Sequence, residues 1–172
     1  PIFHTAGIYD EYSFCLIFQF SYYEQIGDFS NCINIIEKLI TTPSSSDSIL
    51  MYKAMLPLFN LKVGEVERAK GLYEELITAY KSYKFSDPAI ESGFLHSLGS
   101  YAQSANIMHA AEEHFIAAIK CHDRIDYQDD VNFAQRLISL ANLYLNWPGF
   151  EDRALDVCEN AYNIIKTSYD VN

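Results

Sequence analysis

The sequence is poor in the residues that β-proteins and nucleic-acid-binding proteins need. Its 172 residues include only 7 Gly and 5 Pro, few for a sheet protein with many tight turns. Lys and Arg together number 12 against 23 Asp and Glu, so the formal net charge is −11. Because phosphate backbones and anionic membranes attract basic surfaces, we expect no direct nucleic-acid partner and no membrane partner.

Signatures of catalysis and of metal binding are also missing. The cysteines Cys15, Cys32, Cys121 and Cys158 form no C-x-x-C pair, the spacing typical of zinc sites. His114 and Cys121 are seven residues apart, but no third ligand follows at metal spacing. There is no G-x-S-x-G element and no phosphate-binding glycine loop. We therefore expect no enzyme activity, no metal and no cofactor.

Long apolar runs are absent as well. The longest candidate, residues 12–23, is about a dozen residues and includes polar positions, too short to span a bilayer. No signal peptide is visible, and the cysteines behave as small apolar residues of helices, so an intracellular, reducing compartment is expected. The chain begins with Pro1 rather than Met, so we expect it to be a piece of a longer protein.

What the sequence does contain is one pattern repeated four times. An apolar stretch is followed by a short break and a second apolar stretch within residues 16–39, 53–76, 95–119 and 140–162. Each break carries helix-stopping residues. The breaks are Gly27-Asp28, Gly64-Glu65, Asn106 to His109, and Pro148-Gly149. Repeats of this length are typical of stacked helix hairpins, because no single hairpin of this size can bury its apolar face.

The second stretch of each copy contains three residues at a fixed spacing. A small residue comes first, a second residue follows four positions later, and an apolar residue follows three positions after that. These triplets are Cys32/Ile36/Leu39, Ala69/Tyr73/Leu76, Ala111/Phe115/Ala118 and Ala154/Cys158/Ala161. The small residue lets two helices approach closely, and the others fill the space between them. The sequence thus predicts one all-α domain. Its four antiparallel hairpins span about 10–41, 46–84, 88–125 and 130–168, and residues 1–9 have no clear partner.

The links between hairpins carry helix-starting residues. Residues 41–48 form a polar loop that ends in capping residues, and Asp87 precedes Pro88, which suits the first position of a helix. Residues 126–130 supply acids before the last hairpin.

This pattern resembles the tetratricopeptide repeat (TPR). The third copy follows that spacing without a gap, from Leu98-Gly99 to Ala111, Phe115 and Ala118. Ala102 stands where the family usually has Tyr, and Pro57 lies inside a first helix, where it should bend the helix. The resemblance implies a right-handed superhelix whose first helices line a concave surface.

In the first helix of each hairpin, a second stripe lies opposite the stripe expected to be buried. It is apolar in the first two hairpins and polar in the last two, which suggests a groove for an extended or helical peptide with anchors at one end and main-chain readers at the other. The alternative is that the apolar residues pack on residues 1–9 or on a further repeat, and that the polar ones are merely solvated. The candidate partner-binding residues are Phe14, Phe18, Met51, Met55, Leu58, Ser97, Ser100, Ser104, Gln135, Ser139 and Asn142.

Residues 50–146 also resemble, more narrowly, the Mau family, the helical-repeat subunit of the cohesin loading complex. The less generic features are Leu95-His96, Tyr101, Asn106 and Met108. The resemblance implies a non-enzymatic nuclear protein of sister-chromatid cohesion and chromosome segregation. Its partner would be the extended N-terminal segment of the large HEAT-repeat loader.

Two other function classes fit the same pattern. One is a bacterial peptide-sensing regulator, since such proteins also have long two-helix repeats with Asn-lined grooves; it would be cytoplasmic. The other is an enzyme regulator without a peptide ligand. Residues 1–37 contain five acids and no Lys or Arg, which favours a basic or neutral partner at that end.

Overall fold

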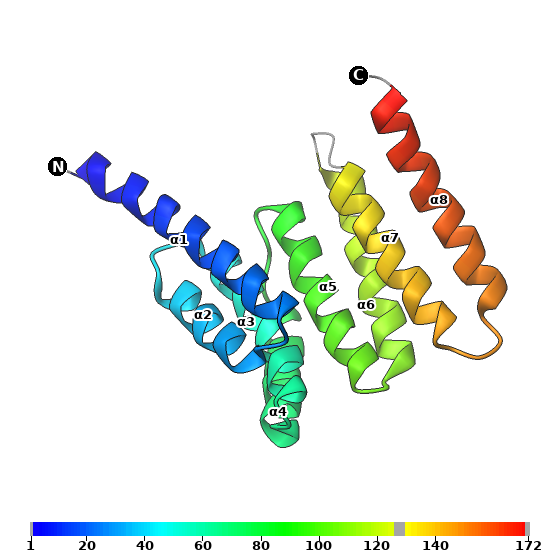
Figure 1. Ribbon diagram of the computed structural model, residues 1–172, viewed down its shortest axis with the longest axis horizontal. Coiled ribbons are helices and arrows are strands. Elements are labelled where there is room, and N and C mark those ends of the chain that lie inside the picture. Colours follow the sequence, from blue (N-terminus) through cyan, green and yellow to red (C-terminus); the bar gives the residue numbers. More distant parts are fainter. Residues whose placement is uncertain (1, 126–129, 171–172) are drawn as a thin grey trace. The chain divides into compact units, whose positions relative to one another are not determined.

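The computed structural model describes the backbone of residues 2–125 and 130–170, and the side chains of residues 11–125 and 130–167. These residues form eight α-helices and one short 3-10 helix, without a strand (Figure 1). The helices are α1 (Ile2–Gln25), α2 (Phe29–Thr41), α3 (Ser46–Lys62), α4 (Val66–Tyr80), α5 (Pro88–Ser104), α6 (Met108–Lys120), η1 (Cys121–Arg124), α7 (Asp130–Leu145) and α8 (Glu151–Asp170). The prediction of an all-α chain is confirmed.

Three helix boundaries differ from the prediction. Helix α1 begins at Ile2 rather than near residue 10. Residues 2–9 contain no proline, and their one glycine is not enough to interrupt the helix. Helix α4 ends at Tyr80, and α6 ends at Lys120 and tightens into the 3-10 turn η1. Such tightening is common at a helix C-terminus. Helix α3 continues through Pro57 to Lys62.

All four predicted breaks are helix stops with left-handed backbone. Gly27, Gly64 and Gly149 have φ values of 75°, 88° and 88°, and Asn106 has φ 61°. Glycine adopts this conformation without a steric penalty, and asparagine is among the residues that tolerate it best. Each break therefore ends one helix and turns the chain back, as the sequence predicts.

The predicted helix starts also carry their caps. Asp28 Oδ1 accepts a hydrogen bond from the Asn31 amide at 3.1 Å, and Asp87 Oδ1 accepts one from the Ala89 amide at 2.8 Å. Ser45 caps α3 in the same way. The acidic segment predicted to start the last hairpin lies largely in residues 126–129, outside the described residues.

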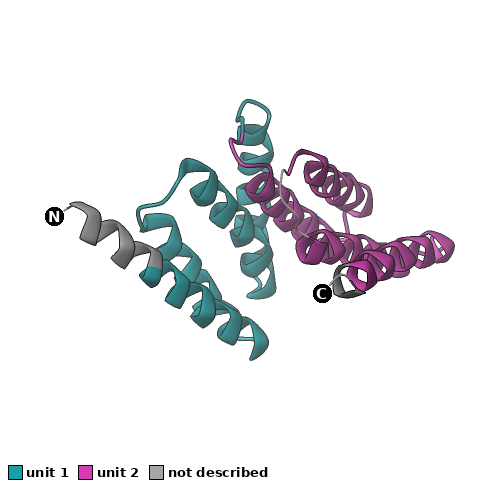
Figure 2. Ribbon diagram, turned by 90° about the horizontal axis from the view of Figure 1, so that it is seen from above, with its two compact units in different colours: residues 1–84 teal, residues 85–172 magenta. Residues whose placement is uncertain are grey.

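The helices form two compact units, residues 1–84 and 85–172 (Figure 2). Unit 1 holds the hairpins α1–α2 and α3–α4, and unit 2 holds α5–α6 and α7–α8. Within each unit, helices adjacent in sequence pack against one another. A single domain wound as a right-handed superhelix remains a prediction.

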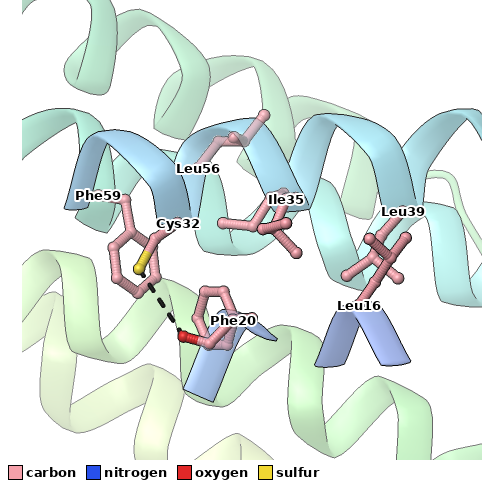
Figure 3. Packing of buried hydrophobic residues seen from close by; sticks show 8 residues of the cluster. Leu16, Phe20, Cys32, Ile35, Leu39, Leu56 and Phe59 are labelled. Carbon is pink, nitrogen blue, oxygen red and sulfur yellow. Dashed lines mark hydrogen bonds between the residues drawn. The ribbon is translucent and has the colours of Figure 1, made fainter. Parts of the chain in front are cut away.

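The core of unit 1 joins α1, α2 and α3 (Figure 3). Phe20 of α1 meets Phe59 of α3 edge to face, with ring centroids 5.2 Å apart. Cys32 is fully buried between them, with its Sγ 4.0 Å from the Phe20 carbonyl oxygen. The cluster consists of Leu16, Phe20, Cys32, Ile35, Ile36, Leu39, Leu56 and Phe59.

The core of unit 2 depends on a close approach of α5 and α6. A Cβ placed on Gly99 would lie 2.6 Å from the ring of Phe115, so any larger residue there would require the ring to shift. The triplets of α2 and α6 are fully buried, as predicted. The triplet of α8 is not: Ala154 and Ala161 are buried, but Cys158 is exposed. Helix α8 packs mainly against α7, so no described helix covers the face that carries Cys158.

Candidate peptide-binding faces

The four hairpins share one register, which identifies equivalent positions in the four first helices α1, α3, α5 and α7. Residues 79 apart, such as Leu16 and Leu95, are both buried. So are residues 42 apart, such as Leu56 and Leu98, or Leu95 and Leu137.

By this register, the stripe that begins with Gly93, Ser97 and Ser100 in α5 recurs in the other three first helices. We call it the first-helix face; its unit 1 part lies on α1 and α3, its unit 2 part lies on α5 and α7, and each part is described within its own unit. None of the eleven residues predicted to bind a partner is buried. The face consists of Phe14, Phe18 and Ser21 in α1, Met51, Met55 and Leu58 in α3, Gly93, Ser97, Ser100 and Ser104 in α5, and Gln135, Ser139 and Asn142 in α7.

In unit 1, the α1 part of this face is an exposed aromatic pair. Phe14 and Phe18 keep 61% and 62% of their surface exposed, and their rings meet edge to face with centroids 4.7 Å apart. They lie on the side of α1 away from the buried Leu16 and Phe20. Neighbouring aromatic side chains this exposed are uncommon unless they contact a partner.

The α3 part of the face is only half exposed. Met55 and Leu58 pack against the unit 1 core cluster, and Met51 is half-buried too. The ammonium group of Lys62, one turn beyond Leu58, lies 4.5 Å from the ring centroid of Phe29. Met55 and Leu58 thus contribute to the core as well as to the surface, so Phe14 and Phe18 are the better anchors for a partner.

In unit 2 the face is lined by serines whose hydroxyl protons already donate hydrogen bonds to backbone carbonyls. Ser97 Oγ donates to the Gly93 carbonyl at 3.0 Å, and Ser100 Oγ donates to the His96 carbonyl at 2.9 Å. What these two hydroxyl groups offer a partner is their acceptor lone pairs. Ser104, at the end of α5, is exposed.

A hydrogen bond beside the face joins α5 to α7. His96 Nε2 lies 2.8 Å from Ser139 Oγ, which also donates to the Gln135 carbonyl at 3.0 Å. Gln135 and Asn142 are exposed on either side of Ser139. Their amide groups can pair with both the donor and the acceptor of a peptide backbone.

His96 is neutral in this setting. Burial, together with the positive charge of Arg136, lowers its pKa to about 3. Arg136 Nε in turn donates to Ser92 Oγ at 3.3 Å, and Ser92 Oγ donates to the Ala118 carbonyl at 3.0 Å. A fixed polar network therefore holds α5, α6 and α7 beside the face.

An exposed aliphatic row on α7 was not predicted. Val131, Ile138 and Leu145 are all exposed, at a spacing of seven residues. That spacing was readable, because apolar residues seven apart share a helical face. Leu155 and Tyr162 of α8 are exposed too.

Two other histidines near His114 in the sequence make ring contacts. His122 stacks on Phe133 with centroids 4.1 Å apart, and His109 meets Trp147 edge to face at 4.7 Å. No group of three potential metal ligands gathers among the described residues. In the same part of the chain, no helix has the length and apolar character of a bilayer span.

No protein-family model matches the chain, and no curated protein matches it significantly.

Proposed function

We propose that this chain is a non-enzymatic, TPR-like module that holds a partner polypeptide along its first-helix face. One observation carries the proposal: no residue of the equivalent stripe is buried in α1, α3, α5 or α7, whereas the opposite stripe of the same helices contains their buried residues. Repeat proteins use such extended faces to bind other chains. A recurrence in four successive hairpins also argues against accidental exposure.

Each unit would bind a segment with its own part of the face. In unit 1, Phe14 and Phe18 would supply most of the affinity, because large apolar side chains that become buried dominate interface energies. In unit 2, Gln135 and Asn142 would pair with the backbone of an extended segment. Residues 1–37 contain acidic residues but no Lys or Arg. This negative charge would favour a basic or neutral segment at the α1 end.

The resemblance to the Mau family supplies a specific candidate partner. On that proposal the bound segment is the extended N-terminal part of the HEAT-repeat cohesin loader, and the protein acts in the nucleus. The exposed amides of Gln135 and Asn142 support the second candidate, a peptide-sensing bacterial regulator, because amides pair with the backbone of any extended peptide.

The test is a selection of binding peptides from a random displayed library, followed by calorimetric titration. The double variant Phe14→Ser/Phe18→Ser should weaken the selected peptide by about 2 kcal/mol or more. Asn142→Ala should cost about 1 kcal/mol, the worth of one hydrogen bond. The matched control is Val66→Ser, which removes an exposed apolar residue of α4. If Val66→Ser weakens binding as much as the Phe14/Phe18 variant, the partner does not lie on the first-helix face.

A further inference from the structure

Unit 1 contains an apolar groove that is separate from the first-helix face. It is formed by α2, α3 and α4, three successive helices that each have a helix of the chain before and after them. Its volume is about 370 Å³, near the lower end of the range typical of small-molecule sites. The buried Leu56 and Leu76 line it, as do Ile40 and Leu72, which pack against the unit 1 core cluster. The groove is therefore built onto side chains that the core already holds in place.

Two charged residues of the groove lie opposite each other on one helix hairpin. Helices α3 and α4 pack against each other on either side of the turn at Gly64. Lys53 lies eleven residues before Gly64 and Glu75 lies eleven residues after it, so the two side chains line the groove at the same level of the hairpin. Leu56 and Leu72, each eight residues from Gly64, line it one step closer to the turn. A charged step thus adjoins an apolar step along the groove.

Lys53 and Glu75 offer a cation and an anion to a ligand. Both side chains are exposed, and among the described residues neither belongs to an ion pair. Ion pairs do form nearby, since Arg68 Nη2 lies 3.5 Å from Glu37 Oε1. A ligand with a single charge would be attracted by one of the two groups and repelled by the other, so the two contributions would oppose each other. A ligand that carries both charges would be attracted by both groups.

The rest of the lining indicates the apolar part of the ligand. The remaining side chains are all aliphatic, namely Ile40, Leu50, Leu56, Leu72, Leu76 and Ala79. Branched aliphatic groups pack closely against side chains of this kind, because many weak contacts add up only when the surfaces interlock. The small volume of the groove limits the ligand to a short side chain. A zwitterion with one short, branched aliphatic side chain meets these requirements.

We propose that this groove binds a free aliphatic α-amino acid, such as leucine. The carboxylate of the amino acid would accept hydrogen bonds from the Lys53 ammonium group, and its own ammonium group would donate to the Glu75 carboxylate. Its side chain would pack on Leu56 and Leu72. Both charges of an α-amino acid are attached to one carbon, which suits a head group held between two facing walls. Lys53 lies on the opposite side of α3 from Met55, so this site is independent of the first-helix face.

Backbone amide shifts of the full chain measure the binding of four probes. L-leucine should give saturable shifts around the groove. Leucinamide lacks the carboxylate and 4-methylpentanoate lacks the ammonium group, so each should bind more weakly than leucine by about tenfold or more. Glycine lacks the side chain and should not saturate the chain below about 10 mM. No saturable binding of leucine up to about 10 mM, or equal binding of any of the other three probes, would overturn the proposal.

Removing either charge of the groove should change which probe binds. Lys53→Gln should weaken leucine by about tenfold and should not weaken leucinamide, which has no carboxylate for Lys53 to bind. Glu75→Gln should weaken leucine by a similar factor and should not weaken 4-methylpentanoate. The matched control is Glu67→Gln, which removes an exposed charge of α4 outside the groove and should leave leucine within about twofold. If Glu67→Gln weakens leucine as much as the two groove variants do, Lys53 and Glu75 do not recognise the ligand and the proposal is wrong.

Two further variants locate the bound amino acid, and circular dichroism checks that each one folds. Ala79 is an exposed residue of the groove, so the fold should tolerate Ala79→Phe. The added ring would fill the groove and should weaken leucine by about tenfold or more. Phe14→Ser/Phe18→Ser should leave leucine within about twofold. If the Ala79 variant keeps leucine and the Phe14/Phe18 variant loses it, the amino acid binds on the first-helix face and not in the groove.

Discussion

Gly99→Ala should destabilise unit 2, although alanine is the better helix former. In the interior of a helix, alanine is favoured over glycine by about 1 kcal/mol. At Gly99, however, the new Cβ would lie 2.6 Å from Phe115 Cε1 and 2.7 Å from Cδ1. The Phe115 ring is fully buried, so it can yield only by displacing its own neighbours.

The size of the effect follows from these opposing contributions. Overfilling a packed core costs about 1–3 kcal/mol, and the helix preference returns about 1 kcal/mol of that. The free energy of unfolding should therefore fall by up to about 2 kcal/mol. Gly71 in α4 is the matched control, since a Cβ there meets nothing within 4 Å. Gly71→Ala should raise the free energy of unfolding by about 0.5–1 kcal/mol.

Urea unfolding followed by circular dichroism measures both variants. Adding Phe115→Leu to Gly99→Ala should restore part of the loss, because the smaller side chain leaves room for the Cβ, and the coupling in this double-mutant cycle should be favourable. If Gly99→Ala stabilises the chain as much as Gly71→Ala does, α5 and α6 do not approach as closely as described, and the register built on Ala111 and Phe115 fails with it.

Three further predictions use the same unfolding assay. Ala111→Leu should overfill the hairpin contact and cost about 1–3 kcal/mol, whereas Ser100→Ala on the first-helix face should stay within about 0.5 kcal/mol of the original chain; equal losses would mean that the faces are assigned wrongly. The pKa of His96 is lowered to about 3 in the folded chain, whereas an unfolded histidine has a pKa near 6.5. Between these two pH values the unfolded chain binds a proton that the folded chain does not. The contribution of neutral His96 to the free energy of unfolding should be fully present above about pH 6.5 and should fall toward pH 3 by up to about 1.4 kcal/mol per pH unit. If the free energy of unfolding of His96→Gln depends on pH with the same slope, this explanation is wrong. Asp28→Ala, which removes the α2 cap, should cost about 1 kcal/mol, while Glu65→Ala, at the same position before α4 and without a side-chain cap bond, should change stability by less than about 0.5 kcal/mol.

Local signals in the sequence were enough to predict the hairpins. Gly27, Gly64 and Gly149 end helices with left-handed backbone, and Asp87 caps the helix that begins at Pro88. These are short-range effects of backbone and side-chain chemistry, so a linear sequence contains them. The start of α1 was missed because no start signal marks it in residues 2–9. No stop signal interrupts these residues either, so the helix extends through them.

The candidate face was harder to predict because burial depends on packing between helices. Phe18 and Met55 occupy equivalent positions, yet Phe18 is exposed and Met55 packs against the core cluster. Periodicity assigns both to one stripe and cannot tell how far a neighbouring helix covers it. The exposure of Cys158 escaped prediction for the same reason, since its triplet matches the buried triplet of α6.

Amide chemical-shift mapping with a library-selected peptide tests the central claim most directly. If a partner lies along the first-helix face, the largest shifts should come from α1, α3, α5 and α7, at Phe14, Phe18, Met51, Ser100 and Asn142 and their neighbours. The outward positions of α2 and α4, such as Asn34 and Val66, should not move. Large shifts confined to the second helices, with Phe18 and Asn142 unchanged, would contradict the account.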